Sequence, residues 1–232
     1  EFLSDEFQMV EADNATKGLE LCVGEMPDLV VSDVMMEGLN GWTLCKKLKS
    51  DPEISHIPVI LMTALASQEN KKTGYKVGAD DFITKPFEPE LLKIRIRNIL
   101  ENRAKIKENY LKNKITSVKE LTISRPDEEL MEEMIGILEK NLDNSDFDVN
   151  SFCKEMNVSA SKLYRKIKGI SGLSPVEFIT NYRLKKATQL IKKSDLSISE
   201  IAYKVGFNDP RYFSKRFKKQ FGTTPSEFSS AS

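Results

Sequence analysis

Residues that bind soft metals or form disulfides are scarce in this sequence of 232 residues, which holds three cysteines and one histidine. Cys22, Cys45 and Cys153 are odd in number and far apart, which excludes a disulfide framework and a cysteine-based metal spacing. We interpret them as buried, small apolar side chains in a reducing compartment. The single histidine, His56, excludes a metal site built from several imidazoles, and we interpret it as a loop residue.

Long apolar runs are also lacking. No run approaches the roughly 18 residues that a membrane helix needs, and no signal peptide is recognisable. The sequence therefore predicts a cytoplasmic protein, and its length favours two domains of ordinary size.

The charge is unevenly distributed, although the formal net charge is zero. Residues 1–105 hold 13 Lys and Arg against 18 Asp and Glu, a net charge of −5. Residues 148–232 hold 16 against 7, a net charge of +9. This division favours an acidic control domain joined to a nucleic-acid binder.

The segment 201–225, IAYKVGFNDPRYFSKRFKKQFGTTP, predicts a short helix, a tight turn and a second helix. Gly206 can close the turn, and Asp209 is a suitable N-cap for the second helix. Phe213 and Phe217 lie four apart on the face that points to the core. The opposite face is basic and bears a hydroxyl, as phosphate and base contacts require; it carries Arg211, Ser214, Lys215 and Lys218.

The same pattern occurs about fifty residues earlier, and each copy ends in Gly-x-x-Pro, at Gly172–Pro175 and Gly222–Pro225. Two helix-turn-helix units in tandem are therefore predicted. A single basic helix face is usually no more than a solvated surface, but two such faces at one pitch favour a function. The exposed face of the first unit carries Ser161, Lys162, Arg165 and Lys166.

Residues 126–230 resemble the AraC-type DNA-binding domain. The motif I-A-x-x-x-G-F-x-x-x-x-Y-F-x-x-x-F-K-x-x-x-G-x-x-P runs from Ile201 to Pro225. The resemblance implies two lobes joined by a long helix near Pro175–Lys192, with both second helices entering the major groove on one face of DNA. The expected DNA contacts are the two basic faces together with Asn208, and Lys168 and Lys219 are expected to meet phosphates.

The first hundred residues alternate between strand and helix patterns, which predicts a doubly wound α/β sheet with its site at the C-terminal strand ends. A near-continuous apolar run over Asp28–Val34 is typical of a buried parallel strand. The predicted strands are Gln8–Glu11, Asp28–Val34, Pro58–Thr63 and Asp81–Thr84, and the predicted helices are Asn14–Gly24, Trp42–Leu48, Ser67–Val77 and Pro89–Asn102.

Polar residues close three of these strands: Asp33, Thr63 and Lys85. Taken singly, Asp33 could cap a turn, Thr63 could fill a strand end and Lys85 could be solvated. Brought together in one crevice, they suit phosphoryl chemistry, because a carboxylate can attack phosphorus while a hydroxyl and an ammonium stabilise the phosphoryl oxygens.

Residues 1–104 resemble the receiver domain of response regulators through VVSDVMM, LMTA and GADDFITKPF. The resemblance implies that Asp33 is the phosphoacceptor and a Mg²⁺ ligand, with Thr63 and Lys85 as switch partners. It also implies that Phe82 is the aromatic side chain whose rotamer follows phosphorylation. Met35 would place an apolar side chain near any attacking water, which favours slow hydrolysis.

The sequence departs from the receiver pattern in two places. Glu37 stands where such loops usually carry proline. No strand that ends in paired acidic residues precedes Gln8–Glu11, so this strand lacks its expected neighbour and two sheet edges are left bare. We therefore expect a part of a longer polypeptide, or missing upstream residues, and expect this chain to bind Mg²⁺ poorly and to be phosphorylated weakly.

Residues 105–127 are predicted to link the domains, as a solvated tether or as an extension of the last receiver helix; the tether is favoured. The DNA-binding domain would occupy residues 128–232 and begin with a helix over Glu128–Leu142. This order of domains is found at the C-terminal end of hybrid two-component regulators, although a stand-alone regulator cut short would look the same.

The function predicted is a non-enzymatic, sequence-specific transcription factor controlled by phosphorylation of Asp33. Its expected partners are double-stranded DNA, a histidine kinase that could belong to the same polypeptide, RNA polymerase and a second copy of the chain. The alternative is a signalling module whose receiver is a phosphate sink and whose helical half binds protein.

Overall fold

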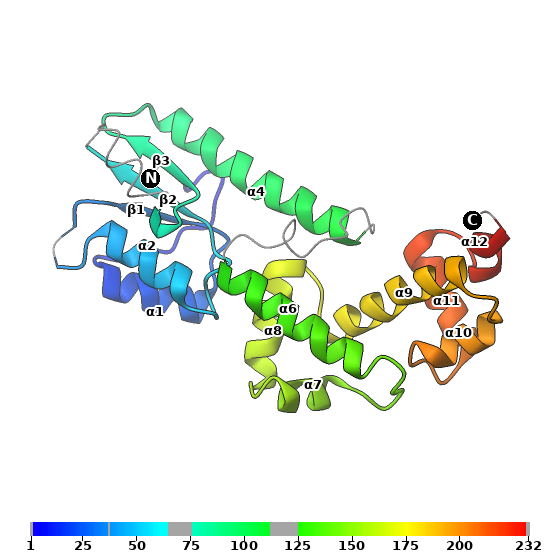
Figure 1. Ribbon diagram of the computed structural model, residues 1–232. Helices are drawn as coiled ribbons and strands as arrows, with labels where there is room; N and C mark the ends of the chain where they lie inside the picture. Colours follow the sequence, from blue (N-terminus) through cyan, green and yellow to red (C-terminus); the bar gives the residue numbers. More distant parts are fainter. Residues whose placement is uncertain (1, 37, 65–75, 112–124, 231–232) are drawn as a thin grey trace. The chain divides into compact units, whose positions relative to one another are not determined.

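The computed structural model describes residues 2–36, 38–64, 76–111 and 125–230, which form two compact units (Figure 1). Of the described residues, those up to Lys105 and residues 125–128 belong to the first unit, and residues 106–111 and those from Glu129 onward belong to the second. The elements that lie in the first unit, in whole or in greater part, are α1 (Ala15–Glu25), β1 (Val30–Asp33), α2 (Gly41–Ser50), β2 (Val59–Thr63), β3 (Asp81–Thr84) and α4 (Pro89–Leu111).

The first unit is built on a parallel sheet in the order β1-β2-β3, which confirms the predicted fold class. Alternate residues of β2 serve the two faces of this sheet. Val59 and Leu61 pack in a core with residues of α1 and α2, whereas Ile60 packs with Leu92 and Ile96 of α4. Helices therefore cover both faces, and the strand ends are left to carry the polar site.

The cysteines of the first unit behave as small apolar side chains. Cys22 and Cys45 are buried, and Cys153 in the second unit is partly buried. Burial raises the pKa of both the Cys22 and the Cys45 thiols to about 11, so these thiols stay protonated at neutral pH.

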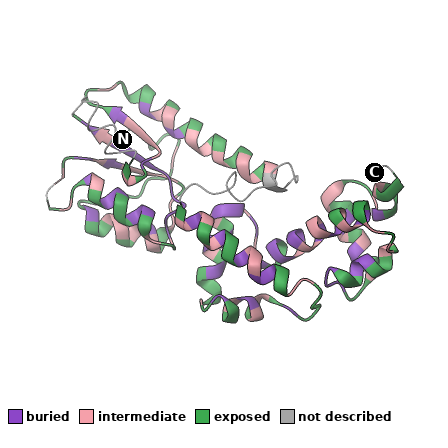
Figure 2. Cartoon of the chain, in the orientation of Figure 1, coloured by how far each residue is buried: buried purple, intermediate pink, exposed green. Residues whose placement is uncertain are grey.

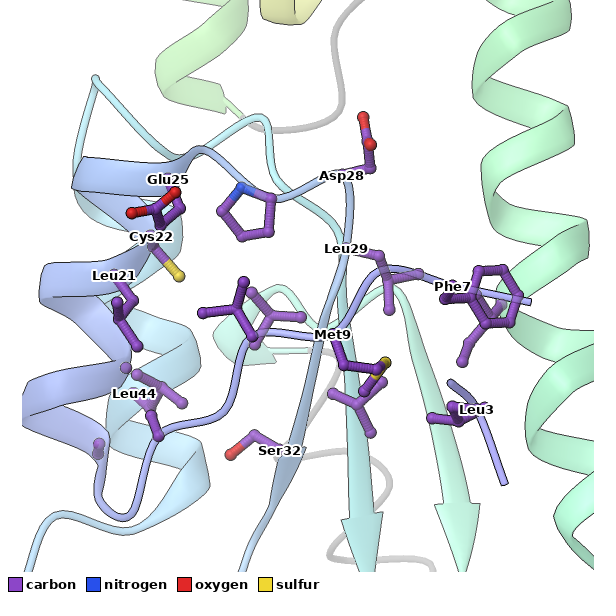
Figure 3. Close-up of a pocket in the computed structure, with 18 of the residues that line it drawn as sticks. Leu3, Phe7, Met9, Leu21, Cys22, Glu25, Asp28, Leu29, Ser32 and Leu44 are labelled. Carbon is purple, nitrogen blue, oxygen red and sulfur yellow. The ribbon is translucent and has the colours of Figure 1, made fainter. Parts of the chain in front are cut away.

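The prediction of a strand over Gln8–Glu11 is wrong, because no described residue there adopts strand structure. A strand needs a partner for its backbone groups, and in the described part of the sheet β1 pairs with β2 alone. A cavity of about 620 Å³ lies where a neighbouring strand was expected, lined by residues of the 7–12 segment, α1 and β1 (Figure 3).

Helix α4 is longer than predicted. It continues to Leu111, so the first residues of the favoured tether are helical, whereas residues 112–124 lie outside the described part of the chain. The cause is local: no glycine or proline follows Pro89 in this run, which is rich in Lys, Arg, Glu and Leu. Most of the predicted helix Ser67–Val77 also lies outside the described residues.

The second unit is helical in its described residues. Its elements are α6 (Arg125–Lys140, whose first turn falls in the first unit), α7 (Val149–Glu155), α8 (Ala160–Ser171), α9 (Pro175–Lys193), α10 (Ile198–Lys204), α11 (Pro210–Phe221) and α12 (Pro225–Ser230). Side chains shape most of the helix starts, as in α9, where Ser174 and Glu177 form a capping box in front of Pro175. The long linking helix predicted near Pro175–Lys192 is confirmed.

Two separate cores divide the second unit into lobes. The first lobe, formed by α6, α7, α8 and the start of α9, buries Phe152, Ile167 and Phe178. The second lobe, formed by the end of α9 with α10, α11 and α12, buries Phe213 and Phe217. Buried positions recur along the inner face of each helix (Figure 2). Among the described residues, no helix is both long and apolar enough to cross a membrane.

Candidate phosphorylation site and nucleic-acid interface

The three predicted strand-end residues lie at one edge of the parallel sheet. Asp33 is the last residue of β1, Thr63 the last of β2, and Lys85 follows β3 directly. The Lys85 amide donates to the Thr63 carbonyl oxygen at 2.8 Å, and the Lys85 ammonium is paired with the Asp33 carboxylate. Thr63 is buried, with an exposed fraction of 3%.

The Asp33 carboxylate is held ionised. Partial burial acts to raise the pKa of Asp33, but the hydrogen bond from Lys85 and those from the Met35 and Val34 backbone amides outweigh it, so that pKa is lowered. The Met35 amide donates to Asp33 Oδ1 at 3.0 Å, which leaves the other oxygen, Oδ2, facing Lys85. With 27% of its side chain exposed, Asp33 is an accessible anionic nucleophile.

Gly41 allows the loop after Asp33 to fold back on the strand end. A Cβ atom at Gly41 would lie 2.2 Å from the Asp33 carbonyl oxygen and 2.9 Å from Val34 Cα. The Gly41 amide donates to the Val34 carbonyl at 3.1 Å, and Asn40 caps the helix that begins at Gly41. The start of α2 is therefore fixed against the backbone of the candidate phosphoacceptor.

Phe82 is half-buried in the core of the first unit and lies beside Trp42. The ring centroids are 6.0 Å apart, and the ring planes meet at 41°. Met35 is 69% exposed beside Asp33. Glu37, the predicted departure in this loop, lies outside the described residues.

The described residues do not make a complete Mg²⁺ site. Mg²⁺ is held by several oxygen ligands in octahedral geometry. In the described part of the chain, no three His, Cys, Asp or Glu side chains lie close enough together to bind a metal ion. Receiver domains typically bind Mg²⁺ at the phosphorylation site, and Asp33 supplies one carboxylate of the kind required.

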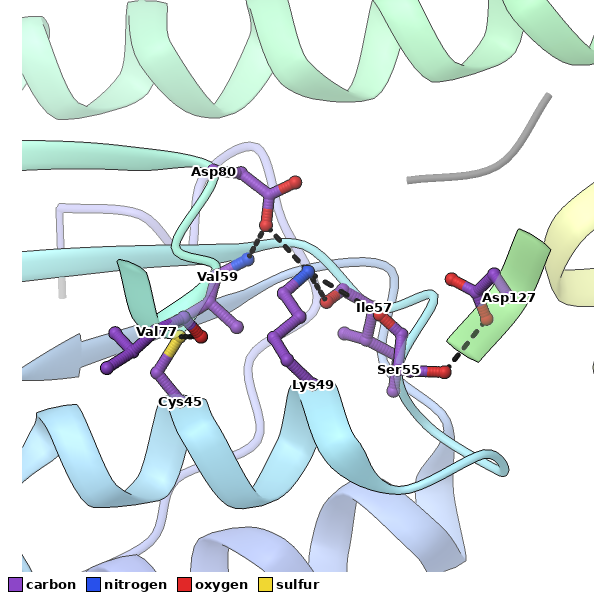
Figure 4. Close-up of polar contacts among 8 residues, drawn as sticks. All are labelled: Cys45, Lys49, Ser55, Ile57, Val59, Val77, Asp80 and Asp127. Atoms are coloured by element: carbon purple, nitrogen blue, oxygen red, sulfur yellow. Dashed lines mark hydrogen bonds and ion pairs between the residues drawn. The ribbon is translucent and has the colours of Figure 1, made fainter. Parts of the chain in front are cut away.

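An ion pair between a buried lysine and a partly buried aspartate supports the sheet near the opposite ends of the strands (Figure 4). Lys49 Nζ lies 2.8 Å from Asp80 Oδ2 and donates to the Ile57 carbonyl oxygen at 2.8 Å. The same Asp80 oxygen accepts from the Val59 amide at 2.8 Å. Within this unit, Ser55 also donates to Asp127, which is fully buried, at 2.8 Å. No pattern in the sequence indicates this cluster.

The two predicted reading helices are α8 and α11, and they are built alike. Ser159 caps α8 and Asp209 caps α11 at their N-termini, and a glycine with positive φ ends each helix, Gly172 and Gly222. Leu163 and Ile167 of α8 are buried, as Phe213 and Phe217 of α11 are. Their outer faces are therefore free of core packing.

The structure places most of the predicted DNA-contact residues on those outer faces. Arg165 and Ser214 are partly buried, and Ser214 Oγ donates to the Pro210 carbonyl within its own helix at 2.9 Å. The exposed members are Ser161, Lys162, Asn208, Arg211, Lys215 and Lys218, together with Lys168 and Lys219, for which phosphate contacts were predicted.

Lys166 is the exception. The prediction that Lys166 belongs to the exposed face is wrong, because its exposed fraction is 4%. Ile167 beside it is fully buried, so this side of α8 faces the core of the first lobe and not the solvent. The apolar stem of a lysine can pack against a core, and sequence spacing alone did not separate Lys166 from its exposed neighbours.

Two aromatic residues on the reading helices were missed. Tyr164 of α8 is 47% exposed and Tyr212 of α11 is 51% exposed. The Tyr212 ring lies 6.2 Å from that of Phe207, which holds it at the start of its helix. Tyr212 follows the exposed Arg211, and Tyr164 precedes the partly buried Arg165. A position beside a basic residue on an amphipathic helix was the available signal.

Comparison with known families matches both units. Residues 1–97 match the response regulator receiver domain, and residues 152–231 match a helix-turn-helix domain. The chain therefore carries a response regulator receiver domain followed by a helix-turn-helix domain of the predicted AraC type. Both matched families are non-enzymatic.

Among particular proteins, the chain is 42% identical over 226 residues to Histidine kinase P4 of Formosa agariphila. This similarity covers 97% of the chain but only 16% of that much longer protein.

Two solved structures each resemble one part of the chain. The C-terminal domain of AraT, a response regulator from Geobacillus stearothermophilus, is 32% identical with a TM-score of 0.42, covering 44% of this chain and 85% of that one. The receiver domain of the Francisella response regulator 1452 is 38% identical with a TM-score of 0.40, covering 44% and 83%.

Proposed function

We propose that this chain receives a phosphoryl group on Asp33 and binds specific duplex DNA through α8 and α11, as a phosphorylation-controlled transcription factor. The observation that carries this proposal is the presence of two capped helices with exposed basic faces in one unit and an ion-paired, accessible carboxylate at the strand ends of the other. The alternative, a phosphate sink joined to a protein-binding half, is not favoured by the helix-turn-helix match.

The phosphoryl step follows from the geometry at Asp33. A carboxylate oxygen of Asp33 attacks the phosphorus of a phosphohistidine, the P–N bond breaks, and the leaving imidazole takes up a proton from water. The product is an acyl phosphate on Asp33. Lys85 offsets charge on the phosphoryl oxygens, and the hydroxyl of Thr63, which ends the neighbouring strand, donates to one of them.

Mg²⁺ would neutralise phosphoryl charge during this transfer when bound. Asp33 is the residue of this chain that we expect to contact the ion. A single carboxylate is a weak site for Mg²⁺, so the steps above rely on Lys85 for charge compensation.

DNA reading is proposed for the exposed residues of α8 and α11. Arg211 lies in the first turn of α11, where residues of a recognition helix usually reach base edges. Lys215, Lys218 and Lys219 follow on the outer face and provide charge for phosphates. Recruitment of RNA polymerase, formation of a dimer and a cytoplasmic location are further expectations that belong to this proposal.

The test is a binding titration of the chain against a duplex selected from random oligonucleotides, repeated across salt concentrations. We expect the logarithm of the binding constant to fall steeply and linearly with the logarithm of salt, because phosphate neutralisation releases counterions. A chain that enriches no duplex in the selection would overturn the DNA-binding proposal. Salt-insensitive binding of a protein partner would favour the alternative.

A further inference from the structure

The two lobes of the second unit are joined by more than helix α9. Leu142 lies in the turn after α6, and its side chain packs against both cores, that of the first lobe and that of the second. A chain segment of the first lobe therefore reaches the apolar interior of the second. This contact is independent of the covalent connection through α9.

Arg183 of α9 fixes the same turn with a hydrogen bond. Its guanidinium Nη2 donates to the Asn144 carbonyl oxygen at 2.6 Å. The Arg183 side chain is half-buried, and desolvation lowers its pKa from the ordinary arginine value. A partly desolvated guanidinium that holds a backbone carbonyl fixes position more firmly than an exposed one would.

Gly206 brings the second lobe against this pair. Gly206 is the turn glycine of the second helix-turn-helix unit, with φ of +80°. A Cβ atom there would lie 2.4 Å from the Leu142 carbonyl oxygen and 2.8 Å from Arg183 Nε. The turn therefore sits directly on the Leu142 backbone and the guanidinium, with no room for a side chain. We name Leu142, Asn144, Arg183 and Gly206 the inter-lobe junction.

We propose that Arg183 is a positioning residue that sets the separation of the two reading helices, so that the protein recognises two half-sites only at one spacing. This inference rests on the proposed DNA-binding function. One helix alone would let the lobes turn about the links before and after it, at residues 172–174 and 194–197. A second attachment removes that freedom before DNA is bound, which lowers the entropy cost of engaging both half-sites together.

A purely stabilising role for Arg183 predicts something different. Its loss would then lower the free energy of unfolding and weaken binding to every duplex by the same factor. A positioning role predicts that the penalty for a wrong half-site spacing shrinks, because lobes that are no longer fixed can adapt to it.

The experiment compares Arg183→Met with the unaltered chain on a duplex selected from random oligonucleotides and on versions lengthened at its centre. An insertion of about 5 base pairs, half a helical turn, moves one half-site to the other side of the duplex. We expect the unaltered chain to lose at least about tenfold in affinity on insertion, and Arg183→Met to lose less than about threefold. Lys193→Met is the matched control, because it removes one positive charge from the same helix and leaves the junction intact; it should keep the tenfold penalty.

The ratio of affinities for the original and the lengthened duplex decides the test. If this ratio is the same in Arg183→Met as in the unaltered chain, the inference is overturned while the DNA-binding function stays intact. A second measurement needs no DNA. Spin labels at Lys154→Cys in α7 and Tyr203→Cys in α10, both exposed, report the distance between the lobes after Cys153→Ser removes the partly exposed thiol. We expect a narrow distance distribution that broadens in Arg183→Met. Equal widths would also overturn the inference, whatever the protein binds.

Discussion

Lys85 and Asp33 are ion-paired although the strands β1 and β3 that present them are not neighbours in the sheet. The pair spans the end of β2, where Thr63 lies, and joins residues that are 52 positions apart in the sequence. A lysine held over the carboxylate before any phosphate is present favours the ionised nucleophile and supplies a cation for the product.

Replacement of the predicted acceptor should abolish labelling. We expect acetyl phosphate to label the chain slowly and Asp33→Asn not at all, because an amide oxygen is a poor nucleophile at phosphorus. Intact-protein mass spectrometry measures both. Labelling of Asp33→Asn would show that Asp33 is not the phosphoacceptor. Rapid and complete labelling of the unaltered chain would contradict the expectation of a weak Mg²⁺ site.

The ion pair also predicts a pH dependence of stability. The pKa of Asp33 is lowered from its ordinary value of 3.8, so its contribution to stability is present above that value and is lost as the pH falls through the lowered pKa. As the pH falls below 3.8, the unaltered chain should therefore lose stability relative to Asp33→Asn. Urea titrations at several pH values measure the unfolding free energy of both proteins. A difference between them that does not change with pH would contradict the prediction.

Gly41→Ala should damage the phosphorylation site through the backbone. The added methyl group would overlap the Asp33 carbonyl oxygen, and we expect a loss of about 1–3 kcal/mol in unfolding free energy with slower labelling. Gly24→Ala is the control, because no neighbouring group lies within 4 Å of the added Cβ. Its unfolding free energy should rise by no more than about 1 kcal/mol. Equal effects of the two substitutions would count against the close approach of Gly41.

Lys49→Met should strongly destabilise the first unit. It would leave the partly buried Asp80 carboxylate without its cation, at a cost of about 3 kcal/mol in unfolding free energy. Lys46→Met, an exposed position on the same helix, should change stability by less than about 0.5 kcal/mol. Urea denaturation measures both, and a small effect at Lys49 would mean that Asp80 is better solvated than its burial indicates.

Arg211→Ala and Lys166→Ala should differ in their effect on DNA recognition. Arg211→Ala should weaken binding by about 1–3 kcal/mol and relax the preference at one position of the selected sequence. Lys166→Ala should leave that preference unchanged, because the side chain does not reach the outer face. Repeating the selection with each variant measures this. An unchanged preference for Arg211→Ala would argue against base reading.

Local patterns were sufficient for much of the fold and the site. Apolar runs that end in Asp33, Thr63 and Lys85 predicted neighbouring strand ends, because parallel strands bring their carboxyl ends to one edge. The turn glycine Gly206 and the N-cap Asp209 predicted the second helix-turn-helix unit, since these features act within a few residues. The repeat of the same pattern, ending in Gly-x-x-Pro, predicted the first.

Features that depend on distant partners were not predictable in the same way. The pattern at Gln8–Glu11 is that of a strand, but a strand forms only beside a neighbour that accepts its hydrogen bonds. Burial of Lys166 and the Lys49–Asp80 pair both result from tertiary packing that spacing along one helix does not encode. The contact of Gly206 with Arg183 likewise joins residues of different elements.

The position of Trp42 has a practical consequence. It is the single tryptophan of the sequence, and it lies beside Phe82 in the core of the first unit. Intrinsic indole fluorescence therefore monitors the receiver alone, while far-ultraviolet circular dichroism is dominated by the helices of the other unit. The melting of each unit can thus be followed in one sample without attaching a dye.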